Sequence, residues 1–261
     1  MNIYNNLNKM IDYIEDNLEQ EIDNKKLAMI VGVNVYTLQR LFPLISNVTI
    51  NEYIRKRRLT VACTDLVQNK MKIMDVAIKY GYDSATSFSR AFESFHGVKP
   101  GQVKESVGKL KYYPKLEFEI PEIETELDYE IVELEGMRLY GIGVKTNQSN
   151  IKKDAPNLFV EVKKTLSMPD YGMVVYNDRV NSDEYEYWVL WKEKQPNTKE
   201  IKIEKSKWLK FKIDSQDEKD IQAMSDRFYL KFLPTCEYKI REMPELEYYH
   251  DGVTEFLVPI N

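Results

Sequence analysis

The most constraining feature of the sequence is a motif that occurs twice within the first hundred residues, with a spacing of about fifty residues. Each copy has a small residue, then a glycine, then an apolar, basic, apolar series. With one extra residue in the second turn, the corresponding pairs are Ala28 and Ala77, Gly32 and Gly81, Leu38 and Phe88, Arg40 and Arg90, and Phe42 and Phe92. Matches that stay in register predict two copies of one folded unit.

The first copy is typical of two helices joined by a tight turn. Ala28 is small enough for two helices to cross, Gly32 permits a positive φ in the turn, and Asn34 is a good N-cap for the second helix. Leu38 and Phe42 are four residues apart and are expected to face inward. The segment is therefore predicted to be a helix-turn-helix.

The outward side of that second helix is predicted to carry Tyr36, Gln39 and Arg40. Gln and Arg side chains can make bidentate hydrogen bonds to purine edges in the major groove. This outward face is therefore suited to reading the bases of double-stranded DNA. The alternative for Tyr36, at the start of a helix, is that it simply packs.

A long helix is predicted between the two copies. Its apolar residues are Tyr53, Ile54, Val61, Ala62 and Leu66. Arg58 falls on or beside this apolar stripe, whereas Arg55 and Lys56 point away from it. Such a helix would set the distance between two reading helices, so that one chain addresses two major-groove segments about 34 Å apart. Arg55 and Lys56 are candidates for phosphate contacts, and the alternative is a solvated helix face.

The charge of the chain is divided unevenly. The net charge is −5, yet residues 1–110 hold 15 basic against 12 acidic residues, and residues 111–261 hold 22 against 30. The second part also carries 21 of the 31 aromatic residues. An acidic, aromatic region suits an apolar or cationic ligand better than it suits phosphate.

Several classes of protein are not expected. Apolar runs are too short to span a bilayer and the amino terminus lacks a signal pattern, so we expect a cytoplasmic protein. Two cysteines, Cys63 and Cys236, and two histidines, His96 and His250, are too few for a structural zinc site. We expect no cofactor, no metal and no contact with a membrane.

With these features, residues from about 3 to 106 resemble the DNA-binding domain of the AraC/XylS family. The second copy contains the family signature in Ile73, Asp75, Val76, Ala77, Gly81, Tyr82, Ser84, Phe88, Ser89, Arg90, Phe92, Gly97 and Pro100, and Arg58, Leu59 and Ala62 resemble its linking helix. The resemblance implies that the first unit reads bases through Tyr36, Gln39 and Arg40, and that the second does so through Ala85, Thr86, Ser89 and Arg90. Ala85 and Thr86 replace the glutamines common in the family, so readout is expected to depend on methyl contacts and Arg90. The alternative for Arg90 is bracing the helix or holding a phosphate.

Helical periodicity ends near residue 108. We predict a multidomain protein, with an all-α DNA-binding domain over residues 1–107, a linker or edge strand over 108–121, and an α+β domain over 122–261. The second domain is expected to contain duplicated β-α-β-β units, forming an antiparallel sheet with helices on one face. The predicted strands are 129–134, 137–144, 171–176, 185–191, 207–213, 236–241 and 246–249, and the predicted helices are 157–166 and 219–233.

This second domain resembles the GyrI-like effector-binding domain. The likeness is carried by residues 207–211, 232–235, 244–249 and 254–260. It implies that Glu247 faces cationic, aromatic compounds in a pocket, whereas the residues alone favour a surface carboxylate. Candidates for the pocket wall are Tyr176, Trp188, Trp208 and Tyr248, and ordinary core packing is the alternative for each.

These features favour a transcription regulator whose second domain senses a small molecule and changes how the first binds promoter DNA. One alternative is that the second domain hydrolyses a small electrophile, with a glutamate and tyrosines doing acid–base work. Another is a constitutive DNA-binding protein whose second domain docks a partner such as RNA polymerase.

Overall fold

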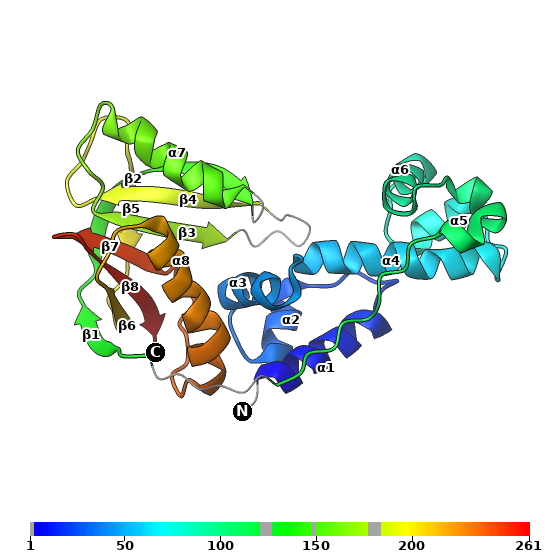
Figure 1. The fold of residues 1–261 in the computed structure, drawn as a ribbon, viewed down its shortest axis with the longest axis horizontal. Coiled ribbons are helices and arrows are strands. Elements are labelled where there is room, and N and C mark those ends of the chain that lie inside the picture. Colours follow the sequence, from blue (N-terminus) through cyan, green and yellow to red (C-terminus); the bar gives the residue numbers. More distant parts are fainter. Residues whose placement is uncertain (1–2, 121–126, 148–149, 177–183) are drawn as a thin grey trace. The chain divides into compact units, whose positions relative to one another are not determined.

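The computed structural model describes residues 3–120, 127–147, 150–176 and 184–261, and the chain separates into two compact units (Figure 1). We call them the helical unit, with Tyr4–Val31 and Ile50–Ile120, and the sheet unit, with Met1–Ile3, Gly32–Thr49 and Pro121–Asn261. The sheet unit therefore includes helix α3 (Val35–Ser46) from the first predicted helix-turn-helix.

The helical unit is built from amphipathic helices. These are α1 (Ile3–Asp16), α2 (Asn24–Val31), α4 (Ile50–Val67), α5 (Ile73–Lys79) and α6 (Ala85–His96), followed by the 3-10 segment η1 (Pro100–Lys109). Leu7, Met10 and Ile14, on one stripe of α1, are fully buried. Asp23 caps α2, because its Oδ1 accepts a hydrogen bond from the backbone N–H of Lys25 at 3.0 Å.

Helix α4 is fixed by two of its four consecutive basic residues. Arg57 is buried and pairs with Glu15 of α1, with 2.7 Å between Nη2 and Oε2. Arg58 donates to the backbone carbonyls of Leu18 and Gln20, at 2.8 and 2.6 Å. These charged hydrogen bonds satisfy groups that would otherwise be costly to bury.

The second helix-turn-helix, α5 and α6, closes over a core of its own. Phe88 and Phe92 of α6 are fully buried with Leu59 and Ala62 of α4. Gly81 takes φ +76° in the turn, a conformation that favours glycine. These contacts confirm the predicted turn and the predicted inward face of α6.

Within its described residues, the sheet unit holds eight antiparallel strands in the order β1-β6-β8-β7-β3-β4-β2-β5. The strands are β1 (Glu130–Leu134), β2 (Met137–Asn147), β3 (Tyr171–Tyr176), β4 (Glu184–Trp191), β5 (Lys199–Ile203), β6 (Ser206–Ile213), β7 (Leu246–His250) and β8 (Val253–Ile260), and the helices are α7 (Ile151–Lys163) and α8 (Glu218–Arg227). Helix α8 continues as η2 (Phe228–Phe232) and η3 (Leu233–Thr235). The duplicated units are therefore β2-α7-β3-β4 and β6-α8-β7-β8.

Four assignments made from the sequence differ from the structure. Residues 236–241 form no strand among the described residues, and their pairing with the sheet is an isolated bridge between Ile240 and Ile260. The last strand of the second half is β8, and β5 is an additional strand. Helix α7 begins at Ile151, six residues before the predicted start, and contains Pro156.

Residues 110–120 contain no strand and lie along the helical unit. The backbone N–H of Phe118 donates to Asn8 of α1 at 2.8 Å, and that of Tyr113 donates to Thr60 of α4 at 3.2 Å. The predicted domain boundaries at 107 and 121 stay predictions. Among the described helices, none alone is long and apolar enough to cross a membrane, although the consecutive pair α2 and α3 meets that criterion when taken together.

Candidate functional site: an acidic, tyrosine-lined cavity

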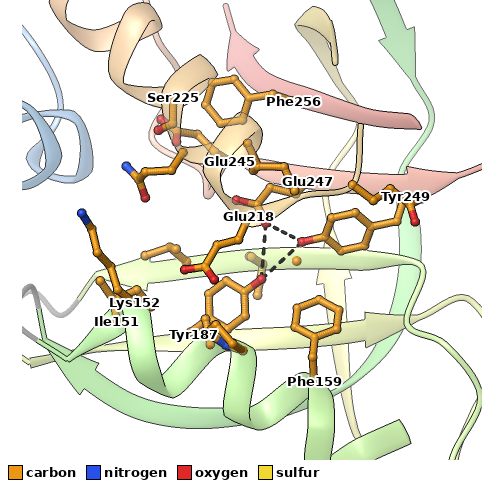
Figure 2. A pocket seen from close by; sticks show the side chains of 18 of the residues that line it. Ile151, Lys152, Phe159, Tyr187, Glu218, Ser225, Glu245, Glu247, Tyr249 and Phe256 are labelled. Carbon is orange, nitrogen blue, oxygen red and sulfur yellow. Dashed lines mark hydrogen bonds between the residues drawn. The ribbon is translucent and has the colours of Figure 1, made fainter. Parts of the chain in front are cut away.

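The sheet unit encloses a cavity of about 350 Å³ between its two helices and the sheet (Figure 2). Helices α7 and α8 both line it, as do strands β3, β4, β7 and β8. Its apolar walls include Phe159 of α7, Ile221 of α8 and Phe256 of β8. A cavity of this size that combines apolar walls with polar and charged side chains is suited to a small molecule.

Glu247 and two tyrosines form a hydrogen-bonded triangle on the cavity floor (Figure 2). The Tyr249 hydroxyl donates to Oε2 of Glu247 at 2.5 Å, and the Tyr187 hydroxyl donates to the same oxygen at 3.3 Å. The two hydroxyl oxygens are 3.3 Å apart. One carboxylate oxygen thus accepts two phenolic hydrogen bonds inside an aromatic enclosure.

The strand register brings this triangle together. Gly172 of β3 lies opposite Glu247 of β7, and Val174 of β3 lies opposite Tyr187 of β4. Glu247 and Tyr249 are two residues apart on β7, so they project to the same face. A Cβ at Gly172 would lie 2.4–2.6 Å from the side-chain oxygens of Tyr249, Glu247 and Tyr187. The absence of a side chain at residue 172 is therefore what leaves room for the triangle.

A second carboxyl, Glu245, lies beside the first. The Tyr229 hydroxyl of η2 donates a hydrogen bond to its Oε1. Burial raises the pKa of Glu245 to about 7, although the hydrogen bond from Tyr229 and the charge of Arg40 act in the opposite direction. Burial likewise raises the pKa of Glu247. Two desolvated carboxyl groups at one cavity favour a ligand that brings positive charge.

Arg40 of α3 reaches this cavity. Its Nη2 donates to Oγ of Ser225 at 3.1 Å, lies 4.0 Å from Oδ1 of Asp226, and its guanidinium carbon lies 6.0 Å from the centre of the Tyr229 ring. Arg40 is among the residues that line the cavity, and its side chain is only 11% exposed. Helix α3 thus contributes a cation to the site in the second half of the chain.

The N-terminal end of α3 is held to the same unit. The Asn34 side chain caps the helix by accepting from the backbone N–H of Thr37 at 2.7 Å, as the sequence predicts. Its Nδ2 donates to the backbone carbonyl of Arg241 at 2.9 Å. One amide side chain therefore both starts the helix and attaches it to the segment between η3 and β7.

The predicted ligand residues are divided between the two faces of the sheet. Glu247 lies in the cavity. Trp188, Trp208 and Tyr248 belong instead to the cluster on the opposite face, which includes the buried Leu139, Leu190 and Leu246. The side chain of Tyr176 lies outside the described residues. The aromatic wall of the cavity comes mainly from other residues.

The sequence prediction missed Tyr187, Tyr249, Glu245 and Arg40. Strand alternation was the available signal for Tyr249 and Glu245, because residues two apart on a strand share a face. Starting from Glu247, that rule selects Glu245 and Tyr249 and rejects Tyr248. No local pattern marks Arg40 as a cavity residue, since its partner Ser225 is 185 residues away.

The predicted DNA-reading residues lie in different environments. On α6, Thr86 and Arg90 are exposed, and Ala85 and Ser89 are partly buried. On α3, Tyr36, Gln39 and Arg40 are all partly buried. Their roles in base reading stay predictions.

The two predicted phosphate contacts also differ. Arg55 is exposed, whereas Lys56 pairs with Glu52 at 2.7 Å and lies 4.9 Å from the centre of the Tyr113 ring. A phosphate would have to compete with that carboxylate for the Lys56 ammonium. Arg55 is therefore the more available of the two.

Two families match the chain, one in each half. Residues 27–106 match a helix-turn-helix domain, and residues 130–260 match an integron-associated effector binding protein. The transcriptional activator AarP of Providencia stuartii is 32% identical over 94 residues, which are 36% of this chain and 70% of AarP. The transposon Tn10 TetD protein of Escherichia coli is 37% identical over 94 residues, 36% of this chain and 68% of TetD. The structure of SAV2435 bound to tetraphenylphosphonium covers 52% of this chain and 94% of that one, at 16% identity and a TM-score of 0.44.

Proposed function

The chain belongs to the AraC-type family of DNA-binding transcription regulators and carries an effector-binding domain, and we propose that its effector is an aromatic organic cation. The observation that carries this proposal is the placement of Glu247 and Glu245 in a cavity with aromatic walls. Ion pairing and cation–π attraction both strengthen when water is excluded, so such a site favours a cation over a neutral compound of the same shape.

The test uses two probes of similar shape and opposite charge, tetraphenylphosphonium and tetraphenylborate. We expect the tryptophan fluorescence of the 261-residue chain to change saturably with the cation and to respond little to the anion. Glu247→Gln should weaken cation binding at least tenfold, since it removes a charge but keeps the shape of the side chain. Glu133→Gln, at a carboxylate paired with Lys205 on the surface, is the matched control. Equal affinity of wild type and Glu247→Gln for the cation would contradict the proposal.

For the DNA-binding half, we propose that Arg90 reads bases and that Arg55 holds a phosphate. Arg90→Ala should lower the preference for DNA selected from a random pool over unselected DNA, by about tenfold or more. Arg55→Ala should weaken binding to both DNAs alike. Competition titrations followed by fluorescence anisotropy measure both effects. Equal loss on both DNAs for Arg90→Ala would show that Arg90 holds the backbone instead.

A further inference from the structure

Helix α3 carries three residues predicted to read DNA, and all three are partly buried. Val35, Thr37, Leu38 and Leu41 are all at most 5% exposed. The helix contacts η2 and β3. By contrast, Thr86 and Arg90 on the corresponding helix α6 are exposed. Base reading in the major groove requires an accessible helix face, so α3 and α6 differ in their readiness to bind DNA.

Arg40 is the residue by which α3 lines the cavity of the acid pair. Its guanidinium charge acts on both Glu245 and Glu247, and its hydrogen bond to Ser225 fixes it at the cavity. Lys152 and Lys163 of α7 also line the cavity, but Arg40 is the cation that lowers the pKa of both glutamates most. The Arg40 guanidinium therefore places a positive charge where the charge of a bound cation is expected to lie.

We propose that Arg40 is an internal ligand of the effector cavity, which holds α3 on the sheet unit until an external cation replaces it. This inference rests on the proposed cation-binding function. The cation favours the state in which α3 is released, because only there are the carboxylates free of the guanidinium. By reciprocity, DNA that binds released α3 must raise the affinity of the cavity for the cation. The chain would then be autoinhibited through its own first reading helix.

The first experiment measures tetraphenylphosphonium binding to the 261-residue chain by calorimetry. Arg40→Ala should bind the probe about 5–50-fold more tightly than wild type, because the competing cation is gone. Lys164→Ala removes a positive charge from the exposed C-terminal end of α7, outside the cavity lining and without touching α3, and should change the affinity less than twofold. Unchanged or weaker binding by Arg40→Ala, with Glu247→Gln still impaired, would overturn the internal-ligand proposal and leave the cation site standing.

A second experiment requires no ligand and leaves the reading helices unaltered. The double variant Ser225→Ala, Asp226→Asn removes the partners of the Arg40 guanidinium on α8. We expect it to bind selected DNA about 3–10-fold more tightly than wild type. Asp220→Asn, an exposed position on the same helix, is the control for the lost charge and should not change DNA affinity.

The two experiments test the cation site and the role of Arg40 independently of each other. A chain that does not bind tetraphenylphosphonium at all counts against the cation site, and the DNA measurement then decides on Arg40 by itself. Equal DNA affinity of the double variant and wild type would overturn the proposed autoinhibition, whatever the cation does.

Discussion

Glu245 makes the stability of the sheet unit depend on pH. Because burial raises its pKa from the ordinary 4.5 to about 7, the folded chain binds this proton more tightly than the unfolded chain does. The resulting stabilisation is complete below pH of about 4.5 and is lost as the pH rises through about 7. We expect Glu245→Gln to remove this trend, so that the difference in unfolding free energy between variant and wild type changes by on the order of 1–3 kcal/mol from pH 5 to 8.

Urea unfolding at several pH values measures that difference. Glu133 is the matched control, since Lys205 holds the pKa of this exposed carboxyl below its ordinary value. Glu133→Gln should show no fall in relative stability between pH 5 and 8. If the unfolding free energies of wild type and Glu245→Gln changed in parallel with pH, the pKa of Glu245 would be the same in the folded and the unfolded chain.

Gly172 is needed for its lack of a side chain. The Cβ of Gly172→Ala would meet three oxygens of the triangle at 2.4–2.6 Å, so at least one tyrosine must move. We expect a loss of on the order of 1–3 kcal/mol in unfolding free energy and at least a tenfold weaker binding of tetraphenylphosphonium. Gly101→Ala, where a Cβ would have open space, should leave both quantities unchanged. Wild-type affinity in the Gly172→Ala chain would show that the triangle does not shape the site.

The segment that leads into and forms β7 shows how much of the site the sequence predicts. Glu247 is found by resemblance, and alternation along Glu245, Glu247 and Tyr249 is sufficient to place these three on one face. Gly172 and Tyr187 are different, because they join the site through the pairing of β3 with β7 and β4. Pairing between strands distant in sequence depends on the whole sheet and has no local signature.

At the scale of elements, the N-cap of α6 shows how local chemistry fixes a reading helix. Ser84 Oγ accepts from the backbone N–H of Ser87 at 3.1 Å, and the Ser87 hydroxyl is 3.3 Å from the backbone N–H of Ser84. Ser84→Ala should destabilise α6 by about 1 kcal/mol, measured as faster amide hydrogen exchange in residues 85–96. Ser94→Ala, at an exposed position within the helix, should have little effect. Equal exchange in both variants would mean that tertiary packing alone holds the helix end.

Helices with N-caps and apolar periodicity were predicted correctly from the sequence, whereas the strand predicted over residues 236–241 does not form. Residues 236–241 alternate apolar and polar side chains, which is a strand pattern. In the structure both edges of β8 are already paired, with β6 and β7, so this segment can bridge only to Ile260 at the end of β8. Periodicity reports the preference of a segment, but the number of free sheet edges decides whether it pairs.

At the scale of the whole molecule, release of α3 should change the salt dependence of DNA binding. Each phosphate contacted contributes about 0.9 to the slope of log affinity against log salt concentration. With α3 held on the sheet unit, we expect only contacts from the helical unit. Tetraphenylphosphonium should steepen the slope by about one or more, because phosphate contacts around α3 are added.

Arg55 provides the control for that measurement, because it lies on α4 in the helical unit and is exposed. Arg55→Ala should lower the slope by about one both with and without tetraphenylphosphonium, whereas Ser225→Ala, Asp226→Asn should give the steep slope even without the cation. A slope that the cation does not change in wild type would mean that α3 contacts DNA equally in both states. The effector would then have to act on transcription after DNA binding, since a ligand with no differential effect on the bound state cannot shift that equilibrium.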